Sequence, residues 1–516
     1  MKPLYSVAQI RAIEQAAAAA LAPGALMQRA GQAAANAALA LLAGLANRSV
    51  LLLAGPGNNG GDALEAAANL AHASAGVDVA VIHLAGSALV SAETAHALAR
   101  ARAGQVRFLD ALPESAPGLV VDGLFGIGLT RALDGAARAL VEAINALGWP
   151  VLALDVPSGL DADTGAVVGQ HGDAIALRAA RTLTFIGDKP GLHTCDGRDM
   201  AGEIEVDSLA IDAPCFPPAS AQLNGAALFA AWLKPRASNS HKGSFGDVAI
   251  VGGARGMAGA AMLAARAALY SGAGRVFVAA LDPGPAFDSV QPEIMFRDGA
   301  AYPMDVGTLV VGPGLGGSTL ATDMLTRALL GGAALVLDAD ALNLIAASPL
   351  LLQRLGARKA PTILTPHPLE AARLLGVASG EVQRDRLAAA RAIAARCNAI
   401  VVLKGSGSVI AEPGGAAVVN TSGNPGLASA GTGDVLAGIC ASLLAQGWPA
   451  LDAALCAVWV HGAGADRLVT QGTGPIGLCA GELPAAVRAV FNELVYEAGP
   501  AAVSAAGLRP AGPPQS

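Results

Sequence analysis

Aromatic residues, charged residues and paired cysteines are scarce in this chain. Aromatic residues make up 3% of the 516 residues and charged residues 14%, and the net charge of −7 is spread thinly. The sequence has no block of lysine or arginine, so we expect no nucleic-acid partner. The six cysteines form no CxxC pair, which predicts buried free thiols in a reducing cytoplasm instead of disulfides or a metal cluster.

Segments typical of secretion or membrane insertion are also missing. The N-terminus has no basic region followed by an apolar run, so we expect no secretory signal. The uncharged stretch between Arg29 and Arg48 contains Gln32, Asn36 and Asn47, and we interpret it as a helix of a globular protein. The sequence therefore predicts a cytoplasmic protein that does not bind a membrane.

Small and aliphatic residues dominate instead. Apolar residues make up 53% of the chain, which also contains 64 glycines. Such a composition suits close packing of helices on a parallel sheet. The length is sufficient for two or more domains.

Strand-like and helix-like runs alternate in two blocks, which predicts parallel sheets with helices on both faces. A proline-rich break at residues 212–221 separates the blocks. We expect one domain over residues 1–218, a second over 223–500 and a disordered tail over 501–516. The expected strands cover residues 49–54, 77–84, 119–122, 151–155 and 182–186, then 247–251, 275–279, 308–311, 334–338, 362–365 and 400–404.

The first glycine-rich loop, residues 55–62, reads Gly-Pro-Gly-Asn-Asn-Gly-Gly-Asp and follows an expected strand. Glycines allow backbone N–H groups at a helix start to approach a phosphate, whereas Asp62 repels one and points to a metal or a proton. The loop formally matches GxGxxG, so a dehydrogenase that transfers hydride is an alternative. The next expected strand, however, ends in Leu84-Ala85-Gly86, without the acid that would hold a ribose.

Two further clusters follow expected strands, Asp-Gly-Leu-Phe-Gly-Ile-Gly-Leu at 122–129 and Asp-Val-Pro-Ser-Gly at 155–159. Ligands of open α/β sheets bind beyond the carboxyl ends of strands, so we expect Asp62, Asp122 and Asp155 to converge on one crevice. Asn59, Asp122 and Ser158 offer hard oxygen ligands, which suit an alkali or alkaline-earth cation. Helix caps and closed turns are the alternative explanation for these residues.

With these motifs, residues 1–215 resemble the N-terminal domain of the YjeF family, the NAD(P)H-hydrate epimerases. The resemblance implies interconversion of the R and S hydrates of NADH and NADPH, with Asp155 as acid and base. It also implies K⁺ bound by Asn59, Asp122 and Ser158. The substrate contacts that it implies are Asn58, Asn59, Gly60, Gly61, Asp62, Gly126, Ile127, Gly128, Leu129, Thr130, Arg131, Ala132 and Asp155.

Three residues in this half bear on how closely the chain follows the family pattern. Ala63 stands where the family usually has glycine, and it would be strained if the backbone there required a positive φ. Gln28 stands where the family's Met-Glu-x-Ala-Gly segment carries a carboxylate. Lys189 resembles the family's lysine near the site, and pairing with a substrate phosphate or solvation on the surface are both open.

The second half contains Gly431-Thr432-Gly433-Asp434 before an apolar helix-like run. An anion hole beside an aspartate is what phosphoryl transfer to a hydroxyl requires, because the aspartate can take the hydroxyl proton. An ordinary helix N-cap is the alternative. The glycine loop 404–408, with its lysine, suits a nucleotide phosphate, and His367 is fixed between two prolines.

Residues 236–495 resemble the nucleotide-dependent NAD(P)H-hydrate dehydratases, which have a ribokinase-like fold. The resemblance implies that the hydrate hydroxyl is phosphorylated and then lost as phosphate, with Asp434 as base. It implies ADP or ATP as co-substrate, ADP being favoured, and we expect Mg²⁺ with it. The implied hydrate contacts are Ala260, Gly316, His367 and Asp434, and the implied nucleotide contacts are Lys404, Gly405, Ser406, Gly407, Ser408 and Gly433.

The expected architecture is therefore α/β with two domains, a Rossmann-like three-layer α/β/α domain followed by a ribokinase-like α/β domain. The expected function is repair of NADH and NADPH hydrates by an epimerase fused to a dehydratase, in a homo-oligomer. The rival is a ribokinase-type small-molecule kinase whose first domain only binds a ligand. ADP formation from ATP without any hydrate would favour that rival.

Overall fold

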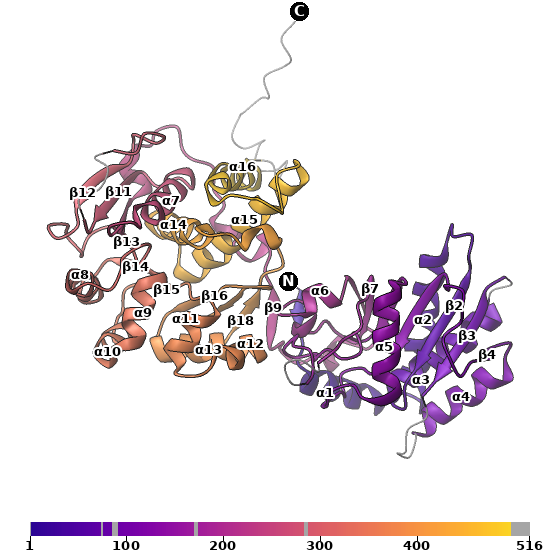
Figure 1. Cartoon of the computed structure of the whole chain (residues 1–516). Helices are drawn as coiled ribbons and strands as arrows, with labels where there is room; N and C mark the ends of the chain where they lie inside the picture. The colour runs from indigo at the N-terminus through magenta and orange to yellow at the C-terminus, as the bar shows by residue number, and fades with distance from the viewer. Residues whose placement is uncertain (1, 74–75, 85–90, 170–173, 283–286, 497–516) are drawn as a thin grey trace, which may run out of the picture. The chain divides into compact units, whose positions relative to one another are not determined.

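The computed structural model describes residues 2–73, 76–84, 91–169, 174–282 and 287–496 (Figure 1). The chain divides into two compact units. The N-terminal unit comprises Lys2–Gln222 with Gln383–Asp385, and the C-terminal unit comprises Leu223–Val382 and the chain from Arg386 onward. The expected tail at 501–516 lies outside the described residues. The limits 1–218 and 223–500 stay a prediction.

A seven-stranded parallel sheet forms the centre of the N-terminal unit, in the order β4-β3-β2-β5-β6-β7-β8. The five strands expected in this half are confirmed. Sequence reasoning missed β4, which has two residues, and β8, whose Glu-Ile-Glu-Val-Asp sequence is mostly charged. The bounds are β2 (Ser49–Ala54), β3 (Asp78–His83), β4 (Arg107–Phe108), β5 (Leu119–Gly123), β6 (Val151–Leu154), β7 (Arg181–Phe185) and β8 (Glu203–Asp207).

Helices cover both faces of this sheet, so successive residues of a strand are buried on opposite sides. Val50 and Leu52 of β2 pack in one core, whereas Leu51 and Leu53 pack in the other. The first core lies under α1 (Val7–Ala18), α2 (Ala25–Leu42), α3 (Asn58–Ala73) and α4 (Ala92–Ala103), and the second lies under α5 (Gly135–Leu147). The three-layer α/β/α prediction is confirmed. The uncharged stretch after Arg29 belongs to α2.

The sheet of the C-terminal unit runs in the order β18-β17-β16-β15-β14-β13-β10-β11-β12. Strands β10 to β16 are parallel, and β17 and β18 turn back antiparallel. Sequence reasoning missed β12, β17 and β18, which have three or four residues each. The bounds are β10 (Asp247–Gly252), β11 (Arg275–Ala280), β12 (Met295–Asp298), β13 (Thr308–Val311), β14 (Ala334–Leu337), β15 (Thr362–Leu364), β16 (Ile400–Leu403), β17 (Val409–Ala411) and β18 (Ala417–Val419).

This sheet also lies between two layers of helices (Figure 1). One layer contains α7 (Ala258–Tyr270), α14 (Thr432–Ala445), α15 (Ala450–Thr470) and α16 (Leu483–Tyr496). The other contains α8 (Thr319–Leu330), α9 (Ala339–Ala347), α10 (Pro349–Gly356), α11 (Pro368–Leu375) and α13 (Arg386–Cys397). The remaining short elements are α6 (Gly197–Met200), α12 (Ser379–Arg384) and an antiparallel pair of β1 (Pro3–Leu4) with β9 (Ala221–Leu223).

Small residues allow the helices to approach closely. A Cβ on Gly438 of α14 would lie 2.1 Å from the carbonyl oxygen of Ala264 in α7. This contact explains why a chain with few aromatic residues still builds a dense core: the volume is filled by backbone and by Ala, Val and Leu side chains.

All six cysteines are free, as expected, but only Cys397, Cys440 and Cys456 are buried. Cys195 and Cys215 are partly exposed and Cys479 is exposed, so the expectation of buried thiols is wrong for these three. Across the described part of the chain, every helix is too short or too polar to cross a lipid bilayer.

Two glycines at the start of α3 offer a test of packing, Gly57 just before the helix and Gly60 in its first turn. A Cβ on Gly60 would lie 1.9 Å from the carbonyl oxygen of Gly55, whereas a Cβ on Gly57 would meet no atom within 4 Å. We expect Gly60→Ala to destabilise the N-terminal unit by about 1–3 kcal/mol, because overpacking forces backbone shifts. Gly57→Ala is expected to stay within about 0.5 kcal/mol of wild type.

The measurement is hydrogen exchange of β2 and β5 peptides in increasing urea. Equal protection in the two variants would contradict the packing assigned to these two glycines.

Candidate active sites

The cavity of the N-terminal unit lies where the strand order reverses. Strands β2 and β5 are neighbours, and the chain continues from them toward opposite edges of the sheet. Ligands of doubly wound sheets bind at such a switch point, beyond the carboxyl ends of the strands. The loops after β2 and β5 line a cavity of about 510 Å³ there.

Most of the predicted substrate contacts reach this cavity. Those that line it are Asn58, Asn59, Asp62, Gly126, Ile127, Gly128, Leu129 and Asp155. Gly60 and Gly61 do not, because they pack inward, Gly60 against Gly55 and Gly61 against Met27. Thr130, Arg131 and Ala132, at the end of the second loop, are also outside the lining.

Asp155 is held firmly at the end of β6. Its backbone has a φ of 66°, a conformation that non-glycine residues seldom adopt and that often marks a functional position. Its Oδ2 accepts from the N–H of Ile127 at 3.0 Å, and its Oδ1 accepts from Nζ of Lys189 at 2.6 Å. A Cβ on Gly126 would lie 2.6 Å from Oδ2, so only glycine fits beside this carboxylate.

The position of Lys189 contradicts both interpretations that the sequence left open, a partner of a substrate phosphate and a solvated surface lysine. Its side chain is fully buried, so it is not a solvated surface lysine. Nζ also donates to Oγ1 of Thr184 at 2.7 Å and to the carbonyl of Phe185 at 2.8 Å. With all three protons donated, the ammonium positions Asp155 and is not directed at a substrate phosphate.

Asp122 lies behind the cavity wall and not in its lining, so the predicted convergence of Asp62, Asp122 and Asp155 holds only for the first and last. Its carboxylate is inaccessible to solvent and accepts from the N–H of Leu124 and from both the N–H and Oγ of Ser158. Burial raises the pKa of Asp122, and these hydrogen bonds from Ser158 and Leu124 oppose that shift.

The side-chain amide of Asn59 is relevant to the predicted cation site. Its Nδ2 donates to the carbonyl of Leu154 at 3.1 Å, while its Oδ1 is buried and has no hydrogen-bond partner among the described residues. A buried amide oxygen without a donor is costly unless a cation or water takes it. With oxygens of Asp122 and Ser158 it would make an all-oxygen donor set, whose chemistry suits K⁺.

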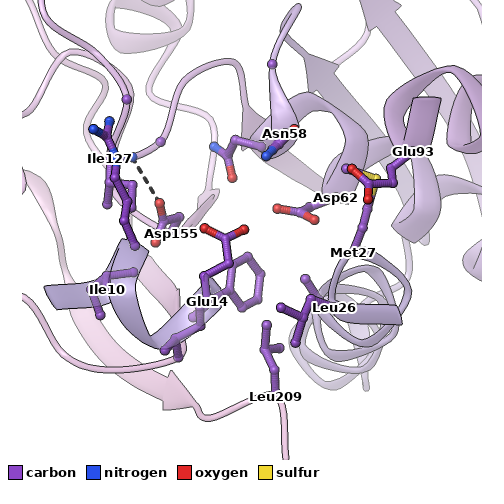
Figure 2. Close-up of a pocket in the computed structure, with 18 of the residues that line it drawn as sticks. Ile10, Glu14, Leu26, Met27, Asn58, Asp62, Glu93, Ile127, Asp155 and Leu209 are labelled. Carbon is purple, nitrogen blue, oxygen red and sulfur yellow. Dashed lines mark hydrogen bonds between the residues drawn. The ribbon is translucent and has the colours of Figure 1, made fainter. Parts of the chain in front are cut away.

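Sequence reasoning missed the acidic residues that helices α1 and α4 bring to the cavity. Figure 2 shows Glu14 and Glu93 directed into it beside Asp62 and Asp155. Burial, and next the charge of Asp155, raise the pKa of Glu14, and the same two effects raise that of Asp62 well above its usual range. The helical spacing of the buried residues in α1, Ile10 among them, could have indicated this, because it places Glu14 near the inward face of the helix.

The two residues that depart from the family pattern, Ala63 and Gln28, are not part of the cavity lining. Ala63 is inside α3, fully buried and without a positive φ, so the strain considered for it does not arise. Its Cβ occupies the space beside Gly123, where a second Cβ would lie 2.5 Å away. Gln28 is exposed and does not line the cavity, so no carboxylate is missing from the cavity at that position.

The cavity of the C-terminal unit, about 410 Å³, lies beyond the carboxyl ends of β14, β15 and β16. Asp434 faces it from the first turn of α14. The N-cap of this helix is Gly431, with a φ of 89°, so Asp434 is not the ordinary N-cap that the alternative interpretation required. Of the other predicted contacts, His367, Lys404, Gly405 and Gly433 line the cavity.

The remaining predicted contacts are outside this lining. They are Ala260, Gly316, Ser406, Gly407 and Ser408. Gly316 belongs to the loop after β13, at the switch point between β10 and β13, and its N–H donates to Oδ2 of Asp340 at 2.8 Å. The switch-point loops are therefore linked to the start of α9, which borders the cavity through Ala339.

Like charges dominate around Asp434. Burial, and next the carboxylate of Asp338, raise the pKa of Asp434 to about 7, and Lys404 opposes the shift. Lys404 itself donates from Nζ to Oδ1 of Asp338 at 2.7 Å. A Cβ on Gly433 would lie 3.1 Å from that Nζ, so the glycine keeps the lysine close to the start of α14. A group with a pKa near 7 is suited to proton transfer at neutral pH.

His367 caps α11 and borders the same cavity. Its Nδ1 accepts from the N–H of Leu369 at 3.1 Å and of Glu370 at 3.4 Å, and Oε2 of Glu370 accepts from the His367 N–H at 2.8 Å. Burial, and next Lys404, lower the pKa of His367, which keeps Nδ1 available as an acceptor. Leu369, the second residue of α11, is exposed.

The elevated pKa of Asp434 predicts a pH-dependent gain in stability for Asp434→Asn. In the folded chain this carboxyl keeps its proton to about pH 7, whereas its ordinary value is 3.8. The folded state is therefore penalised progressively as pH rises through this window, and the asparagine removes the penalty. We expect the gain in Tm over wild type to be small near pH 4.5 and largest at pH 8.

Asp323→Asn, at an exposed position of α8, is the matched control and should give no such trend. Differential scanning calorimetry across this pH range makes the comparison. A gain that is equal at both ends of the range would contradict the shifted pKa.

Family models match both halves of the chain. Residues 23–191 match the model described as YjeF-related protein N-terminus, and residues 248–480 match the model described as NAD(P)H-hydrate dehydratase. A bifunctional NAD(P)H-hydrate repair enzyme of Coxiella burnetii is 38% identical over 509 residues, which cover 95% of this chain and 100% of that protein. The Escherichia coli K12 protein of that name is 36% identical over 465 residues, which cover 87% of this chain and 86% of its own length.

A solved structure is similar over the second half of the chain. It is the ADP/ATP-dependent NAD(P)H-hydrate dehydratase of Bacillus subtilis, co-crystallised with ATP and Mg²⁺, with 31% identity and a TM-score of 0.48. The match covers 53% of this chain and 99% of the Bacillus chain. On the matches of both family models and of the full-length relatives, the chain belongs to the family of bifunctional NAD(P)H-hydrate repair enzymes.

Proposed function

We propose that the N-terminal unit interconverts the R and S hydrates of NADH and NADPH, and that the C-terminal unit dehydrates the S hydrate with ADP or ATP as co-substrate. The observation that carries the proposal is the pair of separate acid-bearing cavities, one in each unit. Family membership supplies the two reactions, and each cavity offers the residues that one of them needs.

In the C-terminal cavity, phosphoryl transfer would begin at the hydroxyl of the hydrate. Asp434 would take the hydroxyl proton while the oxygen attacks the terminal phosphorus of the nucleotide. Backbone N–H groups at the start of α14 and the ammonium of Lys404 would stabilise the charge on the transferring group. Cleavage of the carbon–oxygen bond would release phosphate, and loss of a proton from the neighbouring carbon would restore the ring double bond.

In the N-terminal cavity, the reacting carbon would lie beside Asp155. Hydration of the polarised double bond next to the ring nitrogen places the hydroxyl on the carbon that is bonded to nitrogen. Epimerisation therefore requires proton transfer at that hydroxyl, which Asp155 would perform while Lys189 and Ile127 fix its position. The start of α3 and the backbone N–H groups of the 126–129 loop would bind the phosphates of the dinucleotide.

Asn59, Asp122 and Ser158 would hold K⁺ behind the cavity wall. The unpartnered Oδ1 of Asn59 supports this assignment. The cation would supply a fixed positive charge that joins the loops after β2, β5 and β6.

The remaining expectations belong to the same proposal. We place the division of labour at residues 1–218 and 223–500, Mg²⁺ with the nucleotide, the protein in the cytoplasm and the chains in a homo-oligomer. ADP is the favoured nucleotide. The rival, a small-molecule kinase with a ligand-binding first domain, shares the Asp434 loop but leaves the Asp155–Lys189 arrangement without a function.

The test is the full-length protein with a mixture of R and S NADH hydrates. With ADP or ATP, absorbance of reduced nicotinamide at 340 nm should return until both epimers are consumed. Asp434→Asn should lower dehydration by about 10² to 10⁴, because the amide cannot take the hydroxyl proton. It should leave exchange between the epimers intact, as measured by chromatography. Dehydration at the wild-type rate in this variant would contradict the role of Asp434, and ADP release from ATP without hydrate would favour the rival.

Asp122→Ala should weaken K⁺ binding and slow epimerisation only. Removing the charged member of the donor set costs about 1.5–3 kcal/mol, so the KCl concentration for half-maximal rate should rise about tenfold or more. Asp134→Ala, an exposed position in the same unit, is the control. The titration keeps ionic strength constant with tetramethylammonium chloride. If the wild-type rate is the same in that salt without potassium, K⁺ has no role.

A further inference from the structure

We propose that the Glu14 carboxyl is the second proton-transfer group of the N-terminal cavity, and that it works with Asp155 on opposite faces of the hydrate ring. The inference rests on the epimerase reaction proposed above. Glu14 lies on α1, outside every motif by which the sequence indicated this site.

The chemistry of an epimerase requires such a second group. The carbon–oxygen bond must break on one face of the ring and form on the other, and the reverse reaction exchanges the two faces. One face needs an acid while the other needs a base, and their roles alternate with direction. Asp155, held by Lys189 and Ile127, can serve only the face on which it lies.

Geometry singles out Glu14. Figure 2 shows its carboxyl directed into the cavity in the neighbourhood of Asp155 and Asp62, although it comes from a different wall. Within the described residues its oxygens accept no hydrogen bond, whereas both oxygens of Asp155 are occupied. A half-buried carboxyl without a protein partner is available to a ligand.

Charged groups around Glu14 support a role as the initial acid. They are Arg11 on its own helix, Asp62 from α3, Glu93 from α4 and Asp155 after β6. Burial, then Asp155, then Glu93 raise the pKa of Glu14, and Arg11 opposes them. Asp155, in contrast, accepts from Nζ of Lys189 at 2.6 Å and from the N–H of Ile127 at 3.0 Å, so both of its oxygens are held by the protein. The cavity therefore pairs a carboxyl that is held by two protein donors with one that is open to the substrate.

The step balances without an oxidant or reductant. Glu14 donates its proton to the hydroxyl, the carbon–oxygen bond breaks, and water leaves while the ring-nitrogen lone pair forms a C=N⁺ bond. A water on the opposite face then adds to this carbon and gives its proton to Asp155. Return of that proton to Glu14 through solvent completes the cycle, and the reverse reaction runs through the same groups.

Asp62 is the competing candidate. Burial and three neighbouring carboxylates, Asp155, Glu14 and Glu65, raise its pKa well above the usual range. A raised pKa suits a carboxyl to donate a hydrogen bond to substrate, whereas the base that the reverse direction needs must lose its proton readily. We therefore assign substrate binding to Asp62 and proton transfer to Glu14.

The experiment compares Glu14→Gln with Glu93→Gln in the full-length protein. Both changes remove one carboxylate from the same cavity, so Glu93→Gln controls for charge alone. Conversion of R to S NADH hydrate is followed by chromatography, and dehydration of S hydrate reports whether the protein is folded. We expect Glu14→Gln to lose about 10² to 10⁴ in epimerisation rate and keep dehydration. Glu93→Gln removes a carboxylate from the same cavity and should lower the epimerisation rate far less than Glu14→Gln does, and Glu14→Asp should recover part of the rate.

Two further readouts bear on proton transfer itself. The wild-type rate should fall at high pH as Glu14 loses its proton, and this limb should be absent from the residual activity of Glu14→Gln. In water labelled with ¹⁸O, each inversion should incorporate one labelled oxygen, and retention of the original oxygen would overturn the water-transfer step.

The outcomes separate this inference from the proposed function. If Asp155→Asn abolishes epimerisation but Glu14→Gln matches Glu93→Gln, the reaction stands and the role of Glu14 is wrong. The same conclusion follows if Asp62→Asn, and not Glu14→Gln, removes the high-pH limb. If wild type exchanges no epimers at all, the proposed function itself fails.

Discussion

Both cavities depend on the cost of burying a carboxylate at the end of a parallel strand. Asp155 follows β6 and Asp338 follows β14, and each is nearly inaccessible to solvent. An isolated charge in such a place is unfavourable, and each aspartate is paired with a lysine, Lys189 at 2.6 Å and Lys404 at 2.7 Å. The lysines thus allow negative charge to persist where the fold brings its loops together.

These two aspartates in turn affect the pKa values of their neighbours. Asp155 contributes to the raised pKa values of Glu14 and Asp62, and Asp338 contributes to that of Asp434. In each cavity, one carboxylate fixed by lysine lies near a carboxyl that holds its proton more tightly. Groups with opposed protonation states are what acid–base chemistry at neutral pH requires. The two units therefore share one arrangement, an aspartate paired with a lysine near a carboxyl of raised pKa, although different loops build it.

Much of the fold could be predicted from the sequence because buried parallel strands read as continuous apolar runs. The eleven expected strands all form, and the motif at 431–434 does begin a helix. Among the elements that were missed, β4 and β12 are edge strands too short or too polar to give such a signal. Loop glycines were read as ligand contacts, yet Gly60 and Gly61 serve close packing, a distinction that depends on partners distant in sequence.

The site itself was only partly predictable, for a physical reason. Motif residues such as Asn58 and Asp155 are positioned by the strands they follow, so local sequence indicates where they lie. Glu14 reaches the cavity because α1 packs its inward face on the sheet, and Lys189 is buried because Thr184 and Phe185 complete its hydrogen bonds. The surroundings of Glu14 and Lys189 depend on how the chain packs, so they could not be predicted from the neighbouring residues in the sequence.

Charge also constrains how a dinucleotide could bind in the N-terminal cavity. Arg11 is the only basic residue in its described lining, against the acidic side chains of Glu14, Asp62, Glu93 and Asp155. An anionic pyrophosphate would be disfavoured near that acidic cluster, so under the proposed function it would lie toward the backbone N–H groups of the 126–129 loop and of the first residues of α3. The neutral nicotinamide ring can then occupy the acidic end. Under the proposed function, the distribution of charge in the cavity would orient the substrate with its reacting carbon toward Asp155.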